Sequence, residues 1–165
     1  MSDLFSFPNP VNEVSARLVA AGVMLIALAA IVFQQPWLTA VLAYGFLARV
    51  LTGPTLSPMG QLATRVISPR LPVAPKLVPG PPKRFAQGIG ATVTVLATIL
   101  YFGFGQALWA DVLLGMIVFF AFLESVLAFC VGCQIFALLM KVGLIPEETC
   151  LECRIGFDRP YASGS

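Results

Sequence analysis

Residues 18–48 read LVAAGVMLIALAAIVFQQPWLTAVLAYGFLA, and none of these 31 residues carries a charge. As one α-helix, this run would be about 46 Å long, whereas the hydrocarbon core of a bilayer is about 30 Å thick. The run is interrupted by Gln34-Gln35-Pro36, and proline starts helices well but disrupts their interior. We therefore predict a helical hairpin with one membrane-spanning helix at residues 14–33 and a second at 36–51.

The second half of the sequence repeats this pattern. Residues 85–110 carry no charge, with glycines and a glutamine at 103–106, and the apolar run 112–140 is broken only by Glu124. We predict a third helix at residues 86–104 and a fourth at 109–131. The expected fold is an all-α integral membrane four-helix bundle of two hairpins, formed by a single transmembrane domain at residues 1–153.

The composition agrees with a membrane protein and excludes several kinds of chemistry. Hydrophobic residues make up 58% of the 165 positions and charged residues only 11%, whereas soluble domains average about 25% charged residues. The chain has no histidine, which removes Ser-His-Asp and Cys-His catalysis, imidazole proton shuttles and facial-triad iron sites. We expect the lipid bilayer, and no nucleic acid, as a partner.

The positions of the basic residues predict the orientation. Neither expected hairpin tip contains Lys or Arg, so the positive-inside rule places both termini and the loop 53–85 in the cytoplasm. Trp37 and Trp109 then lie at the outer interface. The basic residues of the loop and of the C-terminal segment are Arg65, Arg70, Lys76, Lys83, Arg84, Lys141, Arg154 and Arg159.

The loop 53–85 is rich in proline, which excludes one long helix. A short amphipathic turn is expected at Met59–Ile67, and the rest is expected to act either as a passive linker or as a lid across the cytoplasmic face. Eight of the thirteen prolines of the chain fall here, at positions 54, 58, 69, 72, 75, 79, 81 and 82.

Two charges fall within the expected spans. Arg49 follows Pro36 by thirteen residues and Glu124 follows Asp111 by thirteen, so each lies about 20 Å from the outer surface. A charge inside a span costs on the order of 3 kcal/mol and faces a partner or a wet cavity. We therefore predict an ion pair between Arg49 and Glu124, acting either as a packing clamp or as a proton or ligand contact.

The four cysteines form two Cys-x-x-Cys pairs, Cys130 with Cys133 and Cys150 with Cys153. The first pair is expected about 29 to 33 Å below the outer surface, at the cytoplasmic edge of the hydrocarbon. A bend near Gly132 would keep the following apolar residues out of water. We predict an interfacial helix ending at Gly143 and a short cytoplasmic C-terminal helix, which together form a Cys-bearing segment at 132–153, followed by a flexible tail at 154–165.

Three interpretations of these cysteines remain open. Two Cys-x-x-Cys pairs can supply the four thiolates of a structural zinc site, at Cys130, Cys133, Cys150 and Cys153. The same four residues can perform thiol-disulfide or sulfur-transfer chemistry, with a membrane quinone within reach of the first pair. No lysine is adjacent to either pair in the sequence, so Cys130 would have to begin a helix whose dipole stabilises its thiolate. The third interpretation is four inert cysteines.

Several segments also resemble a known family. The stretches PNPVNEV at 8–14, GPTLSP at 53–58 and PPKRFAQ at 81–87, with the double Cys-x-x-Cys, resemble a family of small actinobacterial membrane proteins, domain of unknown function 4395. The resemblance runs from about Phe7 to Cys153. It implies a bacterial inner-membrane protein with a thioredoxin-like or rhodanese-like cytoplasmic partner, and it assigns no catalytic residues.

These observations favour a membrane-embedded thiol-disulfide oxidoreductase or sulfur carrier using a double Cys-x-x-Cys site on the cytoplasmic face. The alternative is a structural or binding protein in which the cysteines hold zinc and no catalysis occurs. A transporter subunit is a third class, and it would require a homo-oligomer because the expected spans contain few polar groups.

Overall fold

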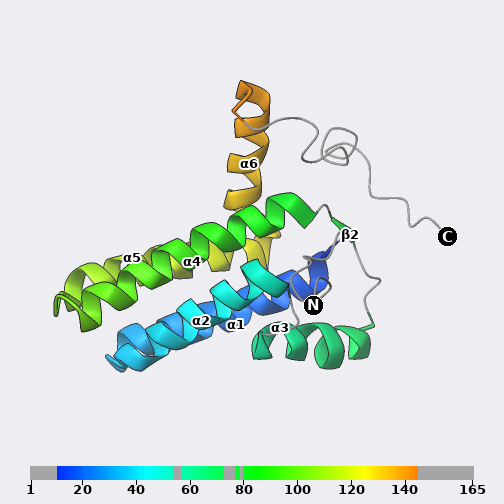
Figure 1. Cartoon of the computed structure of the whole chain (residues 1–165). Coiled ribbons are helices and arrows are strands. Elements are labelled where there is room, and N and C mark those ends of the chain that lie inside the picture. Colours follow the sequence, from blue (N-terminus) through cyan, green and yellow to red (C-terminus); the bar gives the residue numbers. More distant parts are fainter. Residues whose placement is uncertain (1–10, 54–56, 73–76, 79, 145–165) are drawn as a thin grey trace.

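The computed structural model describes residues 11–53, 57–72, 77–78 and 80–144 of the chain. These residues are helical apart from two short strands, β1 (Val11–Asn12) and β2 (Leu77–Val78), which pair antiparallel. The predicted all-α class is confirmed (Figure 1). The second cysteine pair, the short C-terminal helix and the tail fall outside the described residues.

The first hairpin consists of α1 (Glu13–Val32) and α2 (Pro36–Thr52), each within one residue of the expected bounds. Asn12 caps α1, since its side-chain oxygen accepts a hydrogen bond from the Val14 backbone N–H at 3.0 Å. Gln34 turns the chain with a left-handed backbone (φ 49°). Pro36 then occupies the first turn of α2, where its missing N–H has no cost.

The second hairpin consists of α4 (Gly80–Phe102) and α5 (Ala107–Leu127). α4 begins six residues before the expected start at Ala86, because the adjacent prolines at 81 and 82 open the helix instead of ending a loop. α5 ends four residues before the expected end at Val131, where Ala128 adopts a left-handed backbone (φ 55°). The expected loop 53–85 is therefore shorter than predicted.

The central segment contains more helix than the predicted turn at Met59–Ile67. α3 (Pro58–Gln61), the π-helical stretch η1 (Leu62–Ile67) and the 3₁₀ turn η2 (Ser68–Arg70) follow one another without a break. Ser57 caps α3 through the Gly60 N–H at 3.2 Å. The segment lies along α1, where Gly22 leaves room for the Met59 thioether.

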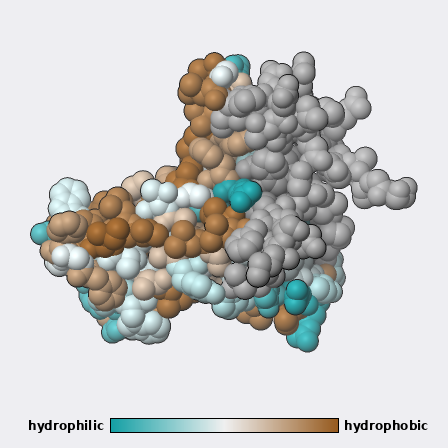
Figure 2. Space-filling model, viewed as in Figure 1, coloured by the Kyte–Doolittle hydropathy of each residue, from teal (hydrophilic) through white to brown (hydrophobic). Residues whose placement is uncertain are grey.

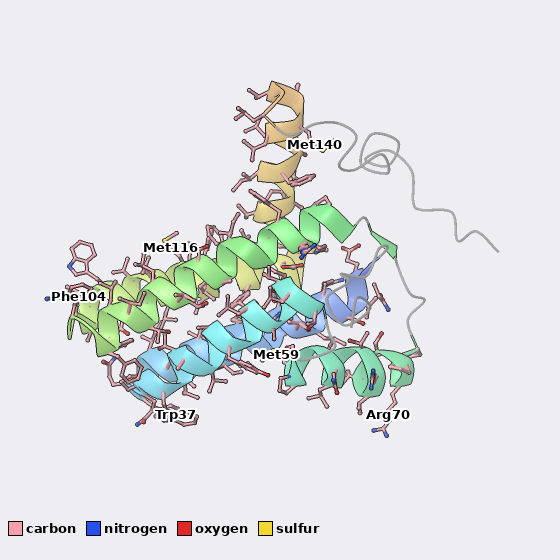
Figure 3. The ribbon with its side chains drawn as sticks, viewed as in Figure 1. Trp37, Met59, Arg70, Phe104, Met116 and Met140 are labelled. Carbon is pink, nitrogen blue, oxygen red and sulfur yellow. The ribbon has the colours of Figure 1, made fainter. Side chains whose placement is uncertain are left out.

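The four long helices form a closed arrangement in which α1 packs against α2 and α5, and α4 packs against the same two helices (Figure 1). Small residues allow close packing at the centre, as is common between membrane helices. Ala27, Ala97 and Ala110 have no exposed surface. The two hairpin tips lie at one end, where Figure 3 shows Trp37 and Phe104, and Arg70 and Met140 lie toward the other.

Three helical segments are long and apolar enough to cross a membrane: α1, residues Pro82–Phe102 of α4, and α5. α2 is apolar but has only 17 residues, which is the lower limit for a crossing. Large hydrophobic side chains cover the outer surface, and Figure 2 shows them along α4 and α6. Such extensive apolar exposure is typical of a surface that faces lipid.

Gly90 provides a test of the helix packing. A Cβ atom there would lie 2.3 Å from the Phe46 ring, whereas one at Gly115 would have no atom within 4 Å. Gly90→Ala should reduce the free energy of unfolding by about 1–3 kcal/mol through overpacking. The matched control Gly115→Ala should raise it by about 0.5–1 kcal/mol. Denaturant unfolding in detergent micelles measures both, and equal effects would contradict the α2–α4 contact.

Candidate functional site

The first cysteine pair lies at the start of α6 (Val131–Val142). Cys130 is the N-cap residue, and its sulfur accepts a hydrogen bond from the Cys133 backbone N–H at 3.3 Å. The Cys133 thiol donates to Cys130 Sγ, with the two sulfurs 2.7 Å apart. Both residues are partly buried. The condition that the sequence set for thiolate stabilisation, a helix beginning at Cys130, is therefore met.

α6 starts beside α4, which it contacts, and projects away from the other long helices (Figure 1). α5 ends at Leu127 and the chain turns at Ala128, slightly before the expected bend at Gly132. Gly132 has a different role: a Cβ there would lie 2.6 Å from the Ala86 Cα, so glycine lets the two helices touch. The Phe85 and Phe136 rings pack with centroids 5.6 Å apart. α6 ends, as predicted, before Gly143 (φ 93°).

A buried ion pair lies beside the cysteines. The Lys83 ammonium on α4 contacts the Glu124 carboxylate on α5, and their side chains are 9% and 15% exposed. Lys83 also interacts electrostatically with Cys130 and Cys133. No lysine is adjacent to the pair in the sequence, but the structure places Lys83 close enough to interact with both thiols. Lys83 is distant from Cys130 in the sequence, and the early start of α4 brings it there.

Arg49 does not form the predicted ion pair with Glu124, whose charge is paired with Lys83. Its guanidinium Nε donates to Gln87 Oε1 at 2.9 Å and its Nη1 to Ser57 Oγ at 3.3 Å. The guanidinium carbon also lies 4.6 Å from the centre of the Phe46 ring. Counting along the expected helices placed Arg49 and Glu124 at similar depths, but it did not reveal Lys83 as a competing cation.

The two thiols have opposite electrostatic environments. The hydrogen bond from Cys133 and the positive charge of Lys83 lower the pKa of Cys130, although burial opposes this shift. The same hydrogen bond, together with burial, raises the pKa of Cys133. These environments favour ionisation of Cys130 over ionisation of Cys133.

A cavity of about 80 Å³ adjoins the cysteine pair. Its lining comes from α1, α2, α4, α5 and the start of α6. The polar lining consists of Arg49, Gln87, Glu124 and Cys130, and apolar side chains cover the rest. On a continuous helix, Glu124 and Cys130 would face different directions. The break at Ala128 instead lets both line one cavity.

The zinc interpretation depends on residues outside the described part of the chain. Within the described ranges, no group of three or more Cys, Asp or Glu residues could hold a metal ion. Cys130 and Cys133 supply two thiolates, and the other two would come from Cys150 and Cys153.

The sequence reasoning missed Lys83, Gln87 and Ser57 as residues of this site. A signal for Lys83 was present, because two prolines directly before a basic residue are typical of a first helical turn. Placing α4 from that signal would have moved Lys83 from the loop into the bundle. Gln87 then follows one turn later on the same face.

A comparison with protein families matches residues 11–141 to the family described as "Domain of unknown function (DUF4395)". The chain belongs to this family. The DUF4395 match covers every described helix except the last residue of α6, and it includes Cys130 and Cys133. It ends before Cys150. Neither the curated proteins nor the solved structures yielded a match.

The charges beside Cys130 make a prediction about its reactivity. Lys83→Met should raise the pKa of Cys130 and slow its alkylation by iodoacetamide several-fold at neutral pH. Glu124→Gln should accelerate it, because the Glu124 carboxylate raises that pKa. Mass spectrometry of the Cys130 peptide over a pH series measures both rates.

The double variant Lys83→Met with Glu124→Gln controls for altered packing. Since both charges are removed, its alkylation rate should lie between those of the single variants. If both single variants change the rate in the same direction, the change reflects exposure of the thiol and the assigned electrostatics are wrong.

Proposed function

We propose that the protein is a membrane-embedded thiol-disulfide oxidoreductase whose reactive pair is Cys130 and Cys133. The observation that carries this proposal is the hydrogen bond between the two sulfurs at the start of α6. It supports a division of roles in which Cys130 attacks and Cys133 resolves. A nucleophile of lowered pKa beside a second thiol is the arrangement that disulfide exchange requires.

The proposed reaction transfers two electrons from a cytoplasmic dithiol to the membrane. One thiolate of the donor attacks the Cys130–Cys133 disulfide and forms a mixed disulfide with Cys130, and Cys133 leaves as a thiolate and takes a proton. The second thiol of the donor, as its thiolate, attacks the donor sulfur of that mixed disulfide. The donor then leaves as a disulfide, with Cys130 and Cys133 reduced. A membrane quinone accepts two electrons and the Cys133 proton from this pair, together with a second proton from water, which restores the disulfide.

The proposed setting is the bacterial inner membrane, with four spans and both termini in the cytoplasm. The shared end of the two hairpin tips and their lack of basic residues support this orientation. The donor dithiol is then the pair Cys150 and Cys153, which a cytoplasmic thioredoxin-like or rhodanese-like protein reduces in turn.

Trapping of a mixed disulfide tests the proposed function. In Cys133→Ser, the nucleophile remains and the resolving thiol is lost, so oxidised glutathione should leave one glutathione on Cys130. The control Cys130→Ser should accumulate much less, because the pKa of Cys133 is raised. Intact-protein mass spectrometry measures the adduct. Equal labelling of both variants would contradict the assigned roles.

Metal analysis of the same preparation separates the main alternative. Near-stoichiometric zinc that only a chelator removes, with all four thiols protected until then, would overturn the redox proposal in favour of a structural zinc site. Metal-free protein with a reducible Cys130–Cys133 disulfide supports it.

Cysteine labelling tests the orientation. In a variant with all native cysteines replaced by serine, a single cysteine at Gly105 should react with a membrane-impermeant maleimide in spheroplasts. One at Arg70 should react only after lysis. Both positions are exposed. The reverse pattern would place the native cysteine pair on the outer face.

A further inference from the structure

We propose that the cavity beside Cys130 binds a small, weakly hydrated monovalent anion, held by the guanidinium of Arg49. Binding at this site does not require the thiol chemistry, although the charge of Cys130 affects its strength. Its ligand is defined by charge, size and hydration.

Within the described ranges, Arg49 forms no salt bridge, although the Glu124 carboxylate attracts its charge. Arg49 is only 6% exposed, and its hydrogen-bond partners Gln87 and Ser57 are both neutral. The nearby carboxylate of Glu124 is already paired with Lys83. Removing a charge from water costs several kcal/mol unless an opposite charge and hydrogen bonds compensate it. A bound anion would supply both.

One nitrogen of the guanidinium has no hydrogen-bond partner in the described part of the chain. This nitrogen, Nη2 of Arg49, is buried. Buried donors without a partner are rare in folded proteins, and each one requires an explanation. Arg49 also lines the cavity, so a ligand there can reach the guanidinium. The unpaired donor and the cavity are separate observations, and both involve Arg49.

The cavity limits the size and chemistry of the anion. A volume of about 80 Å³ accommodates only a few atoms, since a single water needs roughly 10–15 Å³ on the same scale. Phe46, Ile117 and Phe120 give it a mainly apolar wall. An apolar wall cannot replace the hydration shell of a strongly hydrated dianion such as sulfate. Thiocyanate and nitrate fit these limits, and sulfate does not.

Equilibrium dialysis with radiolabelled thiocyanate tests the proposal on full-length protein in detergent micelles. We expect saturable binding of one thiocyanate per chain, displaced by nitrate and not by sulfate. Arg49→Met should abolish it. The matched control Arg70→Met removes an exposed arginine outside the cavity and should retain it. Non-saturable uptake, or equal uptake by Arg49→Met and the unmodified chain, would overturn the proposal and leave water as the occupant.

Two more variants keep the test decisive if Arg49→Met does not fold. Ala16→Leu fills part of the cavity from α1 without replacing the guanidinium, and it should weaken binding at least tenfold. The double variant Cys130→Ser with Cys133→Ser should still bind thiocyanate. Retained binding in that variant, whatever the outcome of the glutathione experiment, separates the anion site from the proposed thiol function. Loss of binding there, or unchanged binding in Ala16→Leu, would contradict the proposed site.

Discussion

The ion pair between Lys83 and Glu124 is the contact on which the end of the structure that carries α6 depends. It joins α4 to α5 where both charges are largely withdrawn from solvent. Removing one member of such a pair costs about 3–5 kcal/mol, because the other charge is left buried and unpaired. The pair thus fixes the start of α4, the surface on which α6 rests. The cysteines acquire their asymmetric environment from that position.

The sequence predicted the charges inside the bundle better than it predicted their pairing. Counting along helices gave Arg49 and Glu124 similar depths, and both line one cavity. The pairing failed because it depends on where α4 begins, and the prolines before Lys83 were interpreted as part of a loop. Helix ends follow from local capping chemistry, whereas partners follow from side-chain competition in three dimensions. An error of six residues at one helix start was enough to change the partner of Glu124.

The turn between α5 and α6 was also predicted only in part, because the sequence indicated that a turn occurs but not where. The apolar residues after Cys133 predicted that α5 could not continue straight, and the structure turns there. Its position was less predictable, because Ala128 adopts a left-handed backbone that alanine rarely takes. Glycine is the usual signal for such a turn, but Gly132 is needed for the close contact with Ala86. The close contact between α4 and α6 requires a glycine at this position, and a single sequence does not reveal such a contact.

The charges around the cavity link anion binding at Arg49 to the redox state of Cys130. Arg49 and Lys83 contribute two positive charges, and Glu124 with a Cys130 thiolate contributes two negative charges, so the reduced site is neutral. When Cys130 forms a disulfide, its negative charge is lost and one positive charge is left over. An anion at Arg49 would then restore neutrality in a region of low dielectric, where uncompensated charge is costly. The oxidised state should therefore bind the anion more tightly than the state with the Cys130 thiolate. By linkage, a bound anion should in turn favour the disulfide.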